Sequence, residues 1–204
     1  MTQWRHRGYA HRVAIALQAR MPWIDIRSAN FAAGGATSTD VRNRIDNAAL
    51  GQAGDLAVIG CGTNDVWRRL RTGDDEVETR LCYEENLHAS VQTLRARTER
   101  VLVVAPPPVG RLAGADTAAV NSELHRYGDA ARAVAAAADA AFASVWEQFR
   151  TTGAHLGWSP GRPPRPGVMS LWRADGVHLT DLGEHLLAEE TLRRLPIPLP
   201  EPGR

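Results

Sequence analysis

Two short, continuous apolar runs constrain the fold more than any other feature of this sequence. They are DLAVIG at 55–60 and VLVVA at 101–105, and both contain β-branched residues. Such runs are typical of strands in a parallel sheet, because helices cover both faces of such a sheet. Segments with helical apolar spacing separate the runs, as a crossover between parallel strands requires. The sequence therefore predicts an α/β protein with a parallel sheet between helices.

Apolar spacing and capping residues predict further elements. Helices are expected over about 9–17 before Pro22, from Thr39 or Asp40, from about 74, over 120–138 and over 181–194. The helix from 74 has an apolar stripe of Val77, Leu81, Leu87, Val91 and Leu94. Strands are expected at 23–30 and around 142–145, and loops at 61–69 and 148–174. We expect one domain over 1–194 and a proline-rich tail over 195–204.

Composition and charge exclude several classes of function. The 204 residues have a net charge of +1, which gives no electrostatic basis for binding nucleic acid. No apolar run is long enough to span a bilayer, and the N-terminal residues lack the apolar core of a signal peptide, so we expect a cytoplasmic protein. Cys61 and Cys82 are too few for a zinc site or a disulfide framework, and we interpret both as buried thiols. No cofactor is expected.

An Asp-x-x-His motif, Asp175 to His178, lies just before the last predicted helix. One interpretation is that both residues are solvated or cap the helix. The other is chemical: Asp175 accepts a hydrogen bond from one imidazole nitrogen of His178, which leaves the other nitrogen free as a general base.

Two glycine-containing segments follow predicted strands, at 34–35 and 62–65. Gly, Asn and Asp all favour turns, so both segments are explicable as turns alone. The functional interpretation is that the side-chain amide of Asn64 and the backbone N–H of Gly35 donate to a developing oxyanion.

The order of these motifs resembles that of the SGNH hydrolases, also called GDSL-type hydrolases. The resemblance rests on the segments at 30–37, 62–65 and 175–178, and on the stretches RGYAHRVA, DLAVIGCGTNDV and LWRADGVHLTDLGEHLLA. It implies a three-layer α/β/α sandwich with a flavodoxin-like parallel sheet. It also implies an oxyanion hole of Gly35 and Asn64, a general base His178 and an orienting Asp175. The implied activity is metal-free hydrolysis of an ester of a small molecule, lipid or carbohydrate.

The sequence departs from the family in its first block, a strand ending in Gly-Asp-Ser whose serine is the nucleophile. No Gly-Asp-Ser and no Gly-x-Ser-x-Gly occurs here, so no nucleophile is visible. The serines present are Ser28, Ser38, Ser90, Ser122, Ser144, Ser159 and Ser170. In the 2-1-3-4-5 strand order the first strand is internal, and its loss would leave unpaired strand edges. We therefore expect the natural chain to start upstream of Met1. The alternative is that Met1 is the start and the sheet is rebuilt or completed by a partner.

Three functions follow from these observations. The first is a serine esterase or acylhydrolase whose serine lies upstream. The second is a serine-independent enzyme in which Asp175 and His178 activate water or a substrate hydroxyl directly. The third is a non-catalytic binding protein that reuses the pocket.

Aromatic and basic residues near these motifs allow two interpretations each. Trp67, Arg68, Arg69 and Arg71 either contact an anionic or aromatic substrate or belong to a solvated loop and helix start. Trp172 either walls the pocket or packs in the core.

Overall fold

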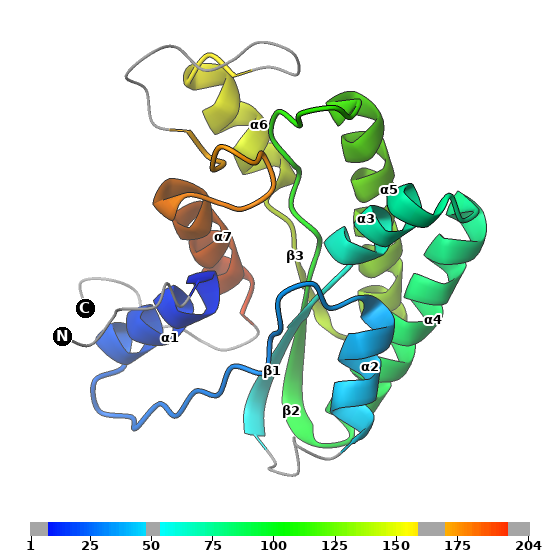
Figure 1. The fold of residues 1–204 in the computed structure, drawn as a ribbon. Helices are drawn as coiled ribbons and strands as arrows, with labels where there is room; N and C mark the ends of the chain where they lie inside the picture. The colour runs from blue at the N-terminus through cyan, green and yellow to red at the C-terminus, as the bar shows by residue number, and fades with distance from the viewer. Residues whose placement is uncertain (1–7, 48–53, 159–169, 196–204) are drawn as a thin grey trace, which may run out of the picture.

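The computed structural model describes residues 8–47, 54–158 and 170–195. Its elements in chain order are shown in Figure 1 and are α1 (Gly8–Arg20), α2 (Ser38–Asp46), β1 (Gly54–Gly60), α3 (Thr63–Thr72), α4 (Glu76–Arg95), β2 (Thr98–Val104), α5 (Thr117–Ala137), β3 (Ala141–Ala143), α6 (Trp146–His155) and α7 (Asp181–Arg194). No helix within these ranges is long and apolar enough to cross a membrane.

The described strands form a parallel sheet in the order β1-β2-β3. Alternate side chains of β2 point to opposite faces, as the pleat of a strand requires. Val101 and Val103 belong to a core cluster with residues of α2, α3, α4 and α5, whereas Leu102 and Val104 belong to a second cluster with residues of α1, α6 and α7. The predicted sheet between two helical layers is therefore confirmed.

Side-chain caps fix where several helices begin. Asp75 and Asp116 accept hydrogen bonds from the first backbone N–H groups of α4 and α5. Thr37 and Asp40 form a reciprocal capping box at the start of α2. Such caps satisfy N–H groups that have no partner within the helix.

The segment 23–30, predicted as a strand, is not one. Its backbone is instead held by the side chain of Gln18, whose amide donates to the carbonyl of Ile24 at 2.8 Å and accepts from the N–H of Ile26 at 3.2 Å. Trp23 and Ile24 are exposed. The sequence has strand-like residues here, but no described strand lies in register beside them to complete a ladder.

The strand β1 is less buried than its apolar sequence predicts. Within the described residues it pairs only with β2, so its other edge is free. Val58 in the middle of β1 is 40% exposed, and Ile59 is the one fully buried residue of the strand. The prediction of burial on both faces is therefore wrong for β1, because nothing in the described sheet covers this edge.

Two predicted loops contain helices. The segment 61–69 forms most of α3, and the segment 148–174 begins inside α6. The first contains Gly62, Asn64 and Asp65, which favour turns, and the Pro- and Gly-rich part of the second begins only at Gly157. Val66 and Phe149 are fully buried, so packing in the core supports a helix in each segment. Residues 159–169 and the tail beyond Leu195 lie outside the described residues.

The first turns of α4 are exposed, against prediction. Val77 is 53% exposed and Leu81 is 49% exposed, whereas the later members of the stripe are buried. A helix of 20 residues spans about 30 Å, while a strand of 7 residues spans about 23 Å. The N-terminal turns of α4 therefore extend past the end of the sheet.

Two matched substitutions test how open the edge of β1 is. We expect Val103→Ala to lower the free energy of unfolding by about 2 kcal/mol, because it opens a cavity where a fully buried side chain stood. Val58→Ala should cost about 0.5 kcal/mol or less, since the side chain is already partly exposed. Urea unfolding measures both, and equal costs would mean that the edge of β1 is covered in solution.

Candidate active site

Asp175 and His178 form a tight local pair in the loop before α7. His178 Nδ1 lies 2.7 Å from one carboxylate oxygen of Asp175. The other oxygen accepts from the backbone N–H groups of Val177 at 2.8 Å and His178 at 2.9 Å. Partial burial opposes ionisation of Asp175, but the hydrogen bonds from the His178 ring and these N–H groups together lower its pKa. The His178 side chain is 75% exposed, so Nε2 is accessible from solvent.

The Asp175–His178 loop is held against the loop that follows β2. The indole N–H of Trp172 donates to the carbonyl of Pro108 at 2.8 Å, and the N–H of Gly110 donates to the carbonyl of Gly176 at 2.7 Å. Gly176 has a φ of +72°, and a Cβ atom there would lie 2.2 Å from the carbonyl oxygen of Arg111. Only glycine fits this close approach without a shift of the backbone. Trp172 is 4% exposed, so it packs in the core.

Asn64, in the first turn of α3, holds the glycine loop before α2. Its side-chain amide donates to the carbonyl of Ala36 at 2.9 Å. An amide nitrogen has two hydrogens, and the second has no acceptor among the described residues. The backbone N–H of neighbouring Gly35 also has no acceptor within those ranges, and its φ is +78°. Asn64 and Gly35 are thus brought together with free donors.

Packing connects the two pairs. Gly62, which caps α3, lies against Pro106 at the end of β2, and the loop that continues from Pro106 contacts Gly176. Val177 packs on the same core cluster as Cys61 and Trp67. Figure 1 shows the loops carrying both pairs at the end of the sheet where β1 and β2 terminate. This is the end at which open α/β sheets place their chemistry.

Ser38 and Asp65 also belong to this region, and the sequence analysis assigned neither a role. The Asp65 carboxylate accepts from the Ser38 hydroxyl at 2.5 Å and from the Ser38 N–H at 3.0 Å. Both residues are buried. The signal available in the sequence was the position of Asp65 directly after Asn64.

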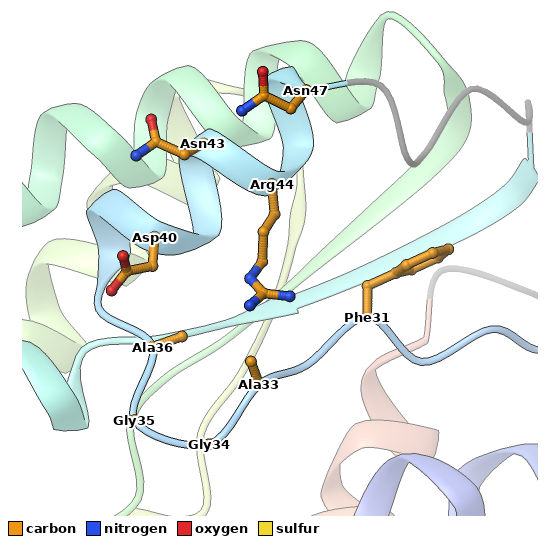
Figure 2. A pocket seen from close by; sticks show the side chains of 9 residues that line it. All are labelled: Phe31, Ala33, Gly34, Gly35, Ala36, Asp40, Asn43, Arg44 and Asn47. Carbon is orange, nitrogen blue, oxygen red and sulfur yellow. The ribbon is translucent and has the colours of Figure 1, made fainter.

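An open pocket of about 490 Å³ lies beside the glycine loop (Figure 2). The segment 31–36 forms one wall, and Asp40, Asn43, Arg44 and Asn47 of α2 form the other. Figure 2 shows Arg44 reaching from α2 toward this segment, with the ribbon of β1 passing between them in this view. Phe31 at the rim is 48% exposed. The pocket is therefore a hollow with one charged and one apolar side.

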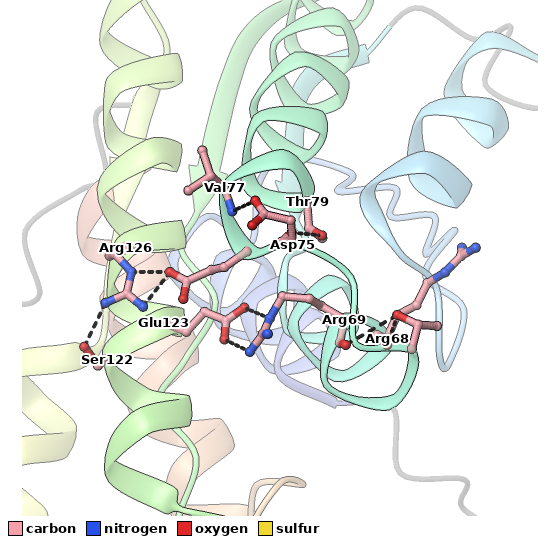
Figure 3. A network of polar contacts seen from close by, with 10 residues as sticks. Arg68, Arg69, Asp75, Val77, Thr79, Ser122, Glu123 and Arg126 are labelled. Atoms are coloured by element: carbon pink, nitrogen blue, oxygen red, sulfur yellow. Dashed lines mark hydrogen bonds and ion pairs between the residues drawn. The ribbon is translucent and has the colours of Figure 1, made fainter.

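In the basic segment after Asn64, Arg69 has a structural role. Figure 3 shows Arg69 of α3 joined to Glu123 of α5 by two hydrogen bonds, of 2.7 and 2.6 Å. Glu123 is 2% exposed, so the pair bridges the two helices away from solvent. Arg68 and Arg71 are exposed, and Trp67 is half-buried against the core.

No serine among the described residues contacts His178. Ser38 is 1% exposed and donates to Asp65, and Ser170 accepts from the N–H of Trp172. Ser159 lies outside the described residues. The hydroxyl that a serine hydrolase needs is not supplied at this site by the parts of the chain that the structure describes.

The cysteines and acidic groups do not form a metal site within the described ranges. Both thiols are free. Burial raises the pKa of the Cys61 thiol, which disfavours the reactive thiolate form. Cys82 is exposed, which corrects the prediction that both thiols are buried.

Polar loops beyond the carboxyl ends of parallel strands are where open α/β proteins place their ligand-binding and active sites. The chain belongs to the GDSL-like lipase/acylhydrolase family, whose sequence model matches residues 1–186. The predicted SGNH membership is confirmed, and with it ester hydrolysis as the class of activity. A sequence search of curated proteins gave no match.

Solved structures with a similar fold include an acetylxylan esterase from Geobacillus stearothermophilus. The two chains are 23% identical with a TM-score of 0.76, over 94% of this chain and 82% of the esterase. An alpha/beta hydrolase enzyme from the metagenome of Lake Arreo, Spain, is 22% identical with a TM-score of 0.73, over 92% of this chain and 80% of that one. At these identities the similarity establishes the fold alone.

We predict that Gly176→Ala will displace the Asp175–His178 loop and lower the free energy of unfolding by about 2 kcal/mol, through backbone strain and the clash with Arg111. Gly73→Ala is the matched control, because Gly73 has a φ of +78° with open space around it. It should cost about 1 kcal/mol, from strain alone. Thermal and urea unfolding measure both values, and equal losses would contradict the close packing at Gly176.

The low pKa of Asp175 depends in part on His178, so His178→Ala should raise that pKa toward the ordinary value. The folded-state pKa is lowered, so Asp175 stabilises the fold above its unfolded-state pKa. This contribution is lost as the pH falls through the lowered folded-state value. Carboxyl ¹³C titration by NMR reports the shift, and an unchanged pKa in the variant would show that the backbone N–H groups alone hold the carboxylate.

Proposed function

We propose that this protein is a serine-dependent ester hydrolase in which His178 is the general base and acid, Asp175 orients it, and Gly35 and Asn64 form the oxyanion hole. The observation that carries the proposal is the 2.7 Å contact between His178 Nδ1 and Asp175. With Nδ1 held by a carboxylate, the exposed Nε2 is left to take a proton.

The free donors at Gly35 and Asn64 support the oxyanion-hole assignment. One hydrogen of the Asn64 amide fixes the glycine loop through Ala36, and the other is available to a ligand. A backbone N–H and a side-chain amide, held before substrate binds, can stabilise charge that develops on a carbonyl oxygen.

We further propose that the nucleophilic serine belongs to a strand that pairs with the free edge of β1. The hydroxyl of Tyr9, at the start of α1, lies close to Gly60 at the carboxyl end of β1. A strand running parallel to β1 on its free edge would therefore end near the start of α1, beside the candidate site. Such a strand would also cover Val58 and complete the ladder on that side.

In the proposed reaction the serine hydroxyl attacks the ester carbonyl while His178 Nε2 takes its proton. The tetrahedral oxyanion is held by Gly35 and Asn64. The ester C–O bond then breaks, and His178 returns the proton to the departing alcohol. Water, deprotonated by His178, hydrolyses the acyl-serine and regenerates the hydroxyl.

Acetylated sugars are the first substrates to examine. The similar structures include three catalytic mutants of one acetylxylan esterase, in which a serine, an aspartate or a histidine is replaced by alanine. The replaced aspartate and histidine are three residues apart in that enzyme, as Asp175 and His178 are here. The match in spacing supports the roles proposed for this pair.

A second candidate function is serine-independent hydrolysis, in which His178 activates water directly. The observation in its favour is that no described serine contacts the imidazole, whose ring is open to solvent. Such catalysis would be slower, because it lacks the covalent intermediate.

Labelling with a fluorophosphonate probe tests the proposal. Intact-mass analysis detects the adduct, and circular dichroism verifies that the protein is folded. We expect no adduct on the 204-residue chain. We expect one adduct on a form of the chain extended upstream in frame, and none when that form carries His178→Ala. His185→Ala, which removes an exposed imidazole of α7, is the matched control and should label like the wild type.

Other outcomes separate the candidates. An adduct on the 204-residue chain would place an activated serine within it and contradict the proposed source of the nucleophile. Turnover of an acetyl ester that is abolished by His178→Ala but insensitive to the probe would establish the serine-independent reaction. Turnover unaffected by His178→Ala would rule out both.

A further inference from the structure

Asp65 is a buried carboxylate whose main partner is a single residue. It accepts three hydrogen bonds from Ser38: two from the backbone N–H, at 3.0 Å to each carboxylate oxygen, and one from the hydroxyl at 2.5 Å. Asp65 is 6% exposed and Ser38 is 1% exposed. Burial raises the pKa of Asp65, while the bonds from Ser38 oppose that shift. A carboxylate buried in this way is unfavourable unless donors are held against it.

A second layer of side chains holds Ser38 in place. The amide of Asn86, from α4, donates to the hydroxyl of Ser38 at 3.4 Å and to that of Thr39 at 3.0 Å. Arg42 in turn donates to the carbonyl oxygen of Asn86 at 3.2 Å. The Ser38 hydroxyl therefore accepts from Asn86 and donates to Asp65, so its orientation is determined.

Two consecutive residues of α3 thus form hydrogen bonds to the residues on either side of Thr37. Asn64 binds the carbonyl of Ala36, and Asp65 binds the N–H and hydroxyl of Ser38. Gly35 comes immediately before the first of these points. Gly35 has a φ of +78°, and no atom lies within 4 Å of the position that a Cβ would take there. Packing around Gly35 therefore does not fix the direction of the loop.

We propose that Asp65 is a positioning residue that fixes the Gly35 loop relative to Asn64, so that the two oxyanion donors keep one spacing before substrate binds. This inference rests on the proposed function for its catalytic meaning. Its mechanical part, the rigidity of the Gly35 loop, stands on the contacts alone. Donors that are already in place cost no reorganisation during the reaction.

The other carboxylate at the start of α2 has a different task. Asp40 binds the N–H and hydroxyl of Thr37 in the capping box and is exposed. It stabilises the first turn of α2 but makes no hydrogen bond to α3 within the described residues. Asp40 is therefore the matched control for Asp65, one carboxylate capping the helix and the other joining two helices.

The test compares Asp65→Asn, Ser38→Ala and Asp40→Asn by ¹⁵N relaxation of the 204-residue chain. We expect the order parameters of the Gly35 backbone N–H and the Asn64 side-chain amide to be about 0.85 in the wild type. In Asp65→Asn both should fall below about 0.6. Ser38→Ala removes only the hydroxyl, so it should give a smaller fall and keep the fold if Asp65→Asn does not. Asp40→Asn should leave both sites rigid.

Unchanged order parameters in Ser38→Ala and Asp65→Asn would overturn the inference, whatever the enzyme's activity. Equal loosening in Asp40→Asn would also overturn it, because capping of α2 would then be what holds the loop.

Kinetics of the form that hydrolyses an acetyl ester test the catalytic part. We expect kcat to fall about tenfold or more in Asp65→Asn with KM within about twofold, because the lost interaction matters in the transition state. Asp65→Glu should recover part of kcat. A loosened loop with unchanged kcat would overturn the catalytic part of the inference and count against the oxyanion hole of Gly35 and Asn64. Absence of any turnover would count against the proposed function, while the relaxation data would still decide the mechanical part.

Discussion

The parallel pairing of β1 with β2 decides where every chemically important loop of this protein lies. Because the two strands run in the same direction, the segments that follow them leave at the same end of the sheet. One segment begins α3 with Asn64, and the other forms the platform on which the Asp175–His178 loop rests. Asn64 and Asp175, which are more than a hundred positions apart, thereby come to the same end of the sheet. No direct contact between their side chains is needed for this. In the sequence, this pairing depends on two short apolar runs, 55–60 and 101–105.

The two halves of the candidate site are held by different physical means. The Asp175–His178 half depends on shape: the indole of Trp172 and the bare backbone of Gly176 fill the space against 108–111. The Asn64–Gly35 half depends on polar contacts, with a buried carboxylate at its centre. The packing of Trp172 and Gly176 against 108–111 involves no ionisable group, so only the Asp175–His178 pair itself responds to pH in that half. The buried carboxylate of Asp65 instead holds the other half together, and it does so only while it is ionised and fully hydrogen-bonded. The halves therefore differ in which changes of solvent each tolerates.

The sequence predicts well those features that depend on local pattern. The buried face of β2, the caps of α4 and the extent of α7 follow from apolar spacing and from Asp75. It fails where a partner decides the outcome: 23–30 has strand residues but no ladder, and Val58 has a buried pattern on a free edge. The motif at 175–178 and the segment at 62–65 can be recognised in the sequence. Ser38, however, lies 27 positions from Asp65, and only the structure shows that the two residues are paired.

The free edge of β1 also bears on how the protein behaves at high concentration. Apart from Asp55 near its start, its seven residues contain neither a charged residue nor a proline, which are features that discourage strands of neighbouring molecules from joining. Val58 and the nearby Phe31 add apolar surface to this edge. Within the described residues this edge is unpaired, and an unpaired strand edge favours intermolecular sheets, so a strand that paired with it would also limit aggregation.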